Sequence, residues 1–150
     1  LLKTLAYEHQ DDLLPAKWEI EHIFPQKWQT NYFPDEPDAT IKEKIEHIGN
    51  KLPFEKKLNI VAGNGYFGKK KKEYIASKIV ITKAMGTSDV MDWNLESITK
   101  RDIRVSDEVV KIMNRWNNEY LNTPVSEGKA GEPSEEELAQ IEKFKKNGWI

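Results

Sequence analysis

One short stretch, residues 18–25 with the sequence WEIEHIFP, constrains the fold more than any other. Apolar and acidic side chains alternate in its first half, which is typical of a half-buried strand with Ile20 on the buried face. Pro25 ends the strand, because proline has no N–H for a ladder and favours an extended residue before it. The stretch therefore predicts a strand that stops beside two adjacent polar residues, Glu21 and His22.

The next segment predicts an irregular loop over 26–37 and then a helix. Asp38 is a suitable N-cap, and apolar side chains recur behind it at helical spacing, at Ile41, Ile45 and Ile48. Gly49 supplies a left-handed helix stop, so the chain is expected to turn sharply at Asn50.

Residues 51–54 read as a second short strand, and Pro53 within it suits only an edge strand or a bulge. A short helix over about 55–62 follows, and the sequence GNG at 63–65 breaks it. The order strand, long insert, short strand, helix predicts a ββα unit.

Helical patterns dominate the remainder of the chain. We expect one longer helix over 67–84, a short one over 93–101 and another that begins at Ser106. Gly, Pro, Ser and Thr make 122–133 a flexible linker, and a capping box begins a final helix over 134–150. The predicted fold class is α+β and mainly helical, with a ββα core and surrounding helices. The predicted main domain covers 1–121.

Composition excludes several classes of site and location. Cysteine is absent, which removes disulfides, thiol nucleophiles and cysteine-based zinc sites, and three histidines make a structural zinc site improbable. No apolar run is long enough to cross a bilayer, and no signal peptide is evident, so we expect a cytoplasmic chain. Leu1 and its neighbours resemble the end of a helix, which suggests a piece of a longer protein.

Positive charge is concentrated in the centre of the chain. Residues 1–50 carry 5 basic and 10 acidic side chains, whereas residues 51–80 carry 8 lysines and 2 glutamates. Six of these lysines are candidate phosphate contacts, and an ordinary solvated face is the alternative. They are Lys56, Lys57, Lys69, Lys70, Lys71 and Lys72.

The residues near the first strand suit the hydrolysis of a phosphodiester. His22 can accept a proton from water near neutral pH, because an unperturbed histidine has a pKa of about 6.5. Glu21 and the side-chain oxygen of Asn59 are hard donors of the kind that Mg²⁺ prefers. Neighbouring residues on a regular strand point to opposite faces, so such a site has to lie where the strand ends.

Together these residues resemble the HNH (His-Me finger) nuclease domain at the C-terminus of GmrSD-type modification-dependent, or type IV, restriction endonucleases. The resemblance covers roughly residues 1–121. It rests on the run 20–26, on Ile48-Gly49-Asn50, on Leu58-Asn59, on Asn64, Phe67, Lys70 and Tyr74, and on the trailing Trp93, Ile98, Arg101 and Trp116.

The resemblance implies a role for each of four residues. His22 would be the general base, and Glu21 and Asn59 would hold one Mg²⁺ or Mn²⁺ ion. Asn50 would brace the loop that bears the base through hydrogen bonds to the backbone. Lys51 and Pro53 depart from the smoother apolar strand of the family, which leaves the pairing of the second strand open.

The resemblance also implies a ββα-metal fold, cleavage of DNA in phage defence, and an N-terminal nucleotide-hydrolysing domain of the same protein. No membrane partner is expected. Two alternatives stay open at this point. One is a non-catalytic DNA-binding or interaction module on the same scaffold, and the other is an RNA-cutting toxin nuclease.

Overall fold

The computed structural model describes residues 1–29, 33, 35–122, 138, 139 and 142. The chain divides into two compact units, Leu1–Met113 and Asn114–Ile150. The linker predicted over 122–133 lies outside the described residues except for Asn122, which is helical. Most of the helix predicted over 134–150 lies outside them as well. Both stay predictions.

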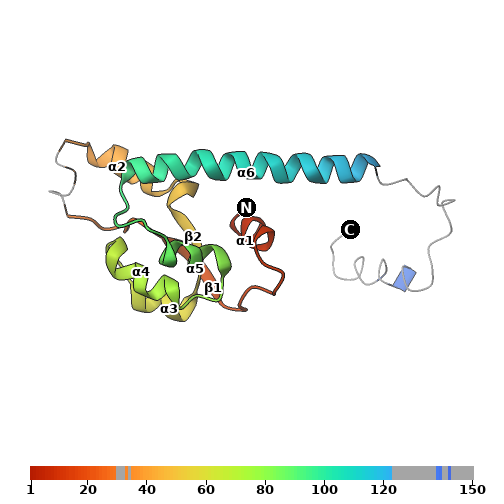
Figure 1. The fold of residues 1–150 in the computed structure, drawn as a ribbon, viewed down its shortest axis with the longest axis horizontal. Coiled ribbons are helices and arrows are strands. Elements are labelled where there is room, and N and C mark those ends of the chain that lie inside the picture. Colours follow the sequence, from red (N-terminus) through yellow and green to blue (C-terminus); the bar gives the residue numbers. More distant parts are fainter. Residues whose placement is uncertain (30–32, 34, 123–137, 140–141, 143–150) are drawn as a thin grey trace. The chain divides into compact units, whose positions relative to one another are not determined.

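The centre of the fold is a two-stranded antiparallel sheet followed directly by a helix (Figure 1). Strand β1, Trp18–His22, pairs along its whole length with strand β2, Lys51–Glu55, so that Ile20 faces Pro53 and His22 faces Lys51. The pairing of the second strand, which Pro53 left open in the sequence, is thus complete. Proline is tolerated because both strands of a two-stranded sheet are edge strands. Helix α3, Lys56–Ala62, completes the predicted ββα unit.

Six α-helices and one 3-10 turn accompany this sheet in the described part of the chain. The α+β, mainly helical fold class is therefore confirmed. Besides α3, these are α1 (Leu2–Glu8), α2 (Asp38–Ile45), the 3-10 turn η1 (Ile48–Asn50), α4 (Phe67–Ile75), α5 (Val80–Thr87) and α6 (Leu95–Asn122). Among the described residues, no helix has both the length and the apolar character of a membrane span.

Aromatic side chains form the core around the sheet. Phe54 on β2 packs edge-on against Tyr74 on α4, with ring centroids 5.2 Å apart, and Phe67 contacts Trp93 at 5.8 Å. Burying one such ring contributes about 1.5–3 kcal/mol. Ile98 from the first turns of α6 is fully buried in the same cluster, so α6 packs against the core around the sheet.

The predicted burial of β1 is wrong at two neighbouring residues, Ile20 and Glu21. Ile20 is 52% exposed, whereas Glu21 is only 4% exposed. The physical reason is that the core beneath β1 offers Glu21 a cation and a hydroxyl, from Lys70 and Tyr74. A buried carboxylate is tolerated when it is paired and hydrogen-bonded.

The single helix predicted over 67–84 is two helices, α4 and α5. Polar contacts hold the chain in the break between them: the Ser77 hydroxyl donates to Glu55 at 2.7 Å, and the Lys78 N–H donates to the same carboxylate at 2.6 Å. The Ser77 oxygen also accepts the N–H of Ile79 at 3.0 Å. The N–H groups of Lys78 and Ile79, which a continuous helix would pair with its own carbonyls, thus find side-chain acceptors.

Conversely, the two helices predicted at 93–101 and from Ser106 are one, because no glycine or proline interrupts α6. The predicted ends of α2 also differ. Asp38 lies in the first turn and makes no capping bond. Gly49 has no positive φ; the described glycine with that conformation is Gly63, at 56°. Gly49 instead allows close approach of α6, since a Cβ there would collide with the Ile98 carbonyl.

Candidate active site at the end of strand β1

A hollow of about 250 Å³ lies at the end of β1 and contains three of the four residues predicted to form the site. Glu21 and His22 enter it from the strand and Asn59 enters it from α3. The lining is completed by Ile20, Gln26, Gly63, Asn64 and Lys70. Residues that are up to about fifty positions apart in sequence therefore surround one polar space.

His22 faces a carboxylate that the sequence did not predict. Its Nε2 lies 3.3 Å from Glu46, which follows helix α2, and the imidazole is 16% exposed. Glu46 also accepts hydrogen bonds from Lys51 at 2.8 Å and from Gln26 at 3.4 Å. The Lys51 bond first, and then His22 and Gln26, lower the pKa of Glu46 to about 2. Glu46 is thus an anion that fixes one side of the His22 ring.

Glu21 is held by two groups on one helix. The Tyr74 hydroxyl donates to its Oε1 at 2.7 Å, and the Lys70 Nζ lies 2.8 Å from the same oxygen. Lys70 also donates to the carbonyl of His22 at 2.5 Å. Burial lowers the pKa of Lys70 and raises that of Tyr74, and the Glu21 charge opposes the first shift and adds to the second.

Both Glu21 and His22 line the same hollow although neighbouring residues on a strand alternate between faces. The explanation is their position: His22 is the last residue of β1, and its pairing with Lys51 is the last of the ladder. Beyond it the chain leaves the sheet through Ile23 and Phe24. The hollow therefore lies at the end of the strand.

Asn50 lies behind the hollow and is completely buried. Its Oδ1 accepts the N–H of Phe24 at 2.7 Å and the indole N–H of Trp93 at 3.2 Å. Its Nδ2 donates to the carbonyls of Phe24 at 3.1 Å and Ile45 at 2.9 Å. The side chain thus joins the exit of β1 to the end of α2 and to the segment before α6.

Arg101 holds the loop around Asn50 from the other side. Its guanidinium donates to the carbonyls of Ile48, Gly49 and Lys51 at 2.9–3.1 Å. Burial, with a smaller contribution from a neighbouring arginine, lowers its pKa to about 10, so it remains a cation at neutral pH. Arg101 therefore binds the carbonyl groups of the loop that carries Asn50.

Asn59 is oriented by its neighbours on β1 and α3. Its Nδ2 donates to Glu19 at 3.3 Å, and Glu19 also pairs with Lys56 at 3.0 Å. Its Oδ1 has no hydrogen-bond partner among the described residues. Asn64, the other asparagine that lines the hollow, uses both ends of its amide on the backbone of Lys27, at 2.6 and 3.1 Å. Asn59 is therefore the asparagine that can offer an oxygen to the hollow.

The donors suit a hard cation with few protein ligands. Glu21 and Asn59 could each offer an oxygen to such an ion, and Mg²⁺ usually keeps several waters beside one or two protein oxygens. Within the described ranges, no cluster of three or more histidine, cysteine or acidic side chains could hold a metal.

The six candidate phosphate-binding lysines have different environments. Lys57, Lys69 and Lys72 are exposed. Lys56 is exposed but paired with Glu19, and Lys71 donates to the carbonyls of Ser88 and Val90 at 2.5 and 2.7 Å. Lys70 is 1% exposed, so its ammonium is engaged inside the fold rather than presented to a polyanion at the surface.

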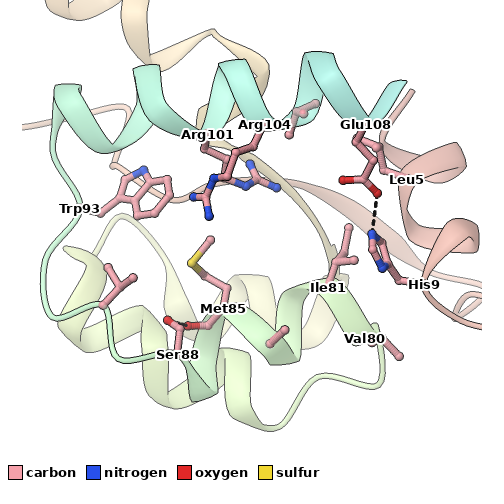
Figure 2. A pocket seen from close by; sticks show the side chains of 13 residues that line it. Leu5, His9, Val80, Ile81, Met85, Ser88, Trp93, Arg101, Arg104 and Glu108 are labelled. Atoms are coloured by element: carbon pink, nitrogen blue, oxygen red, sulfur yellow. Dashed lines mark hydrogen bonds and ion pairs between the residues drawn. The ribbon is translucent and has the colours of Figure 1, made fainter. Parts of the chain in front are cut away.

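A second hollow, of about 380 Å³, lies elsewhere in the same unit (Figure 2). Its walls come from α1, α5 and α6, and Figure 2 shows Arg101 and Arg104 entering it from α6 opposite Met85. Its acidic and imidazole groups, His9 and Glu108, are paired with each other at 2.5 Å. None of the four predicted site residues lines it, so it is not the site that the sequence indicated.

Sequence reasoning missed Glu46 and the polar use of Tyr74. Nothing in the spacing pointed to Glu46, which lies 24 residues from His22. The sequence indicated no polar role for Tyr74. Lys70 and Tyr74 share one face of a helix at i, i+4, but this spacing does not relate that face to Glu21.

The family model that describes the C-terminal domain of GmrSD restriction endonucleases matches residues 1–105. A comparison with curated proteins found no match, and a comparison with solved structures found none either.

Proposed function

Because this chain belongs to the family of C-terminal domains of GmrSD restriction endonucleases, we propose that it is the nuclease domain of such an enzyme and hydrolyses DNA phosphodiesters. The observation that carries the proposal is one hollow lined by Glu21, His22 and Asn59. These three side chains supply the base and the oxygen donors that the reaction needs. We assign the ββα unit to the HNH, or His-Me finger, type.

His22 acts as the general base in this proposal. Its Nε2 faces the Glu46 carboxylate at 3.3 Å, so this is the nitrogen that carries the proton in the neutral ring. The Nδ1 nitrogen is left to accept a proton from water. This arrangement of a base and an orienting carboxylate is the usual pattern of general-base catalysis. Glu46 also stabilises the imidazolium that forms when water is deprotonated.

Glu21 and Asn59 hold a Mg²⁺ or Mn²⁺ ion in this proposal. When bound, the ion would neutralise charge on the phosphate and stabilise the departing alkoxide. The support is chemical: one carboxylate and one amide oxygen open on the same hollow, and Asn59 is turned by its bond to Glu19. The products expected from water attack are 5′-phosphate and 3′-hydroxyl ends.

Asn50 is a positioning residue rather than a group that touches the substrate. It bonds to both backbone groups of Phe24, two residues after the base. This fixes the exit of β1 and therefore the direction of His22. Exposed lysines, namely Lys57, Lys69 and Lys72, with Lys56 and Lys71 beside them, provide phosphate contacts on this side of the chain.

We further propose the biological setting that the family suggests. The domain acts in the cytoplasm on phage DNA with modified bases, together with a nucleotide-hydrolysing domain of the same protein. DNA is therefore the proposed partner. The non-catalytic alternative has less support, because a module that only binds does not need a base, an orienting carboxylate and two oxygen donors around one hollow.

Plasmid nicking tests the proposal directly. The chain is incubated with supercoiled DNA in Mg²⁺, in Mn²⁺ and in EDTA, and the His22→Ala variant is compared with wild type. Cleavage that needs the metal and falls by at least a hundredfold in the variant is expected. His9→Gln is a matched control, since His9 is an exposed histidine outside the hollow.

Two outcomes would contradict the proposal. Cleavage by His22→Ala at the wild-type rate would exclude His22 as the base. DNA binding without any nicking in either metal would favour the non-catalytic module instead. A parallel assay on RNA of the same sequence separates DNA cleavage from the toxin-type alternative.

A further inference from the structure

Two side chains of α4 converge on one oxygen of Glu21. Lys70 and Tyr74 are four residues apart, so they lie on the same face of the helix. The Tyr74 hydroxyl and the Lys70 ammonium reach Oε1 at 2.7 and 2.8 Å, and Lys70 also binds the His22 carbonyl. All three residues are almost fully buried. The contact is thus a built part of the core and not a surface ion pair.

The second oxygen of Glu21 is in a different situation. The Tyr74 hydrogen bond and the Lys70 contact of 2.8 Å both go to Oε1, and no other described residue hydrogen-bonds to Oε2. Yet the described part of the chain contains no buried side-chain oxygen or nitrogen without a partner. Oε2 therefore keeps contact with solvent, and Glu21 lines the hollow at the end of β1.

We propose that Lys70 and Tyr74 are positioning residues that grip Glu21 by Oε1 and present Oε2 to the hollow, and that Lys70 supplies the counter-charge that Glu21 needs when no divalent cation is bound. The metal-binding half of this inference rests on the proposed function. The grip itself does not, because it consists of contacts within the chain. We call these three side chains the Glu21 clamp.

The clamp has an energetic consequence for metal binding. A buried carboxylate that loses its partner is strongly destabilising, so Lys70 keeps the metal-free site folded. A divalent cation on Oε2 would neutralise the same carboxylate. Lys70 and the metal would therefore both neutralise Glu21, so each of them stabilises the fold less when the other is present. The stabilisation that a metal gives should accordingly increase when the lysine charge is removed.

The first test measures the clamp without metal. Melting temperatures are recorded in EDTA for wild type, Lys70→Met, Glu21→Gln and the double variant. Lys70→Met should lower the melting temperature by about 10 °C, because it leaves a buried charge unpaired. The double variant should recover at least half of this loss. Lys69→Met, at an exposed neighbouring lysine, is the control and should shift it by less than about 2 °C.

An additive result would overturn the clamp. If the double variant is as unstable as the two single losses combined, Glu21 and Lys70 do not stabilise each other. Tyr74→Phe offers an independent measurement, since it removes one hydrogen bond and leaves the ion pair. Its loss of stability in EDTA should also shrink in the Glu21→Gln background, and an unchanged loss would count against the inference.

The second test adds Mn²⁺ and measures the rise in melting temperature. The rise should be at least twice as large in Lys70→Met as in wild type, and it should vanish in Glu21→Gln. If Lys70→Met is unfolded in EDTA, the titration is followed by circular dichroism as metal-induced refolding. Equal rises in wild type and Lys70→Met, or no refolding, would overturn the shared role.

These measurements do not depend on cleavage. A chain that cuts no DNA can still pass both tests, in which case the clamp stands and the proposed nuclease function fails. A chain that cuts DNA but shows additive losses in EDTA keeps its nuclease function and lacks the clamp.

Discussion

Asn50 and Phe24 are joined by two hydrogen bonds that use both polar atoms of the amide, at 2.7 and 3.1 Å. The Asn50 side chain thus gives Phe24, which lies beyond the end of β1, the pair of backbone hydrogen bonds that a neighbouring strand would give. Since His22 lies two residues earlier, the exit path of β1 and the direction of the proposed base are set by one fully buried side chain.

Asn50→Ala should therefore unfold the site as well as weaken the domain. It leaves the backbone groups of Phe24, the Ile45 carbonyl and the Trp93 indole without a buried partner. We expect a loss of about 2–4 kcal/mol, measured by urea unfolding. Asn59→Ala is the matched control and should cost less than about 1 kcal/mol. Equal losses in the two variants would contradict the bracing role.

Gly49→Ala should be far more damaging than a glycine change of the same kind on α4. A Cβ at Gly49 would collide with the carbonyl of Ile98 and with Asp102 on α6, so we expect a loss of about 1–3 kcal/mol or more. At Gly68 a Cβ meets nothing within 4 Å. Gly68→Ala should be neutral or stabilising by up to about 1 kcal/mol. Thermal unfolding of both variants tests this, and a tolerated Gly49→Ala would contradict the close contact with α6.

Glu46→Gln should remove part of the acid sensitivity of the domain. The pKa of Glu46 is lowered from 4.5 to about 2 by Lys51, His22 and Gln26. A lowered folded-state pKa means that the carboxylate stabilises the fold above about pH 4.5, and that this contribution is lost as the pH falls towards 2. The difference between wild type and variant should therefore shrink from pH 6 to pH 3. Because the Glu46 side chain is half exposed, screening by solvent limits this difference in stability to about 1 kcal/mol or less. A difference that is constant with pH would contradict the pairing.

Asn59→Leu should change metal dependence more than stability. It removes the amide oxygen proposed for the metal and the bond to Glu19, while a half-buried helix position accepts an apolar side chain. In the nicking assay we expect the Mg²⁺ concentration for half-maximal rate to rise by about tenfold or more. Asn64→Leu is the control outside the proposed donor set, although it loses its bonds to Lys27. An unchanged metal requirement in Asn59→Leu would assign the metal to other groups.

Exchange of exposed lysines should weaken DNA binding and its dependence on salt. In the background of His22→Ala, the double variant Lys69→Gln and Lys72→Gln should reduce the slope of log K against log salt by about 1–2. Lys42→Gln, at an exposed lysine on α2, should leave the slope unchanged. If both variants behave alike, this face does not contact phosphates.

The ββα unit could be predicted because its signals are local. An alternating run, a proline, a glycine-rich break and a lysine-rich helix each have a direct structural meaning, and β1, β2 and α3 follow them closely. The spacing also brought Glu21, His22 and Asn59 to one hollow. The burial of Glu21 and the exposure of Ile20 could not be predicted, since the burial of Glu21 depends on Lys70 and Tyr74, which lie about fifty residues away.

Glu46 illustrates the same limit in the site. Its distance from His22 depends on how the insert between the strands folds back, and this is determined by Asn50 and by α6 rather than by neighbouring sequence. Likewise, the break between α4 and α5 depends on Glu55, whose carboxylate accepts the Ser77 hydroxyl and the backbone N–H of Lys78.

The three carbonyl groups bound by Arg101 have a practical consequence for shortening or transplanting the domain. The ββα unit ends at Ala62, yet the loop within it is fastened by a residue almost forty positions later, and Trp93 and Ile98 complete its core. An excised finger of residues 18–62 would thus lose its fastening along with its core. A fragment that keeps this core and the Arg101 hydrogen bonds has to extend through the first turns of α6.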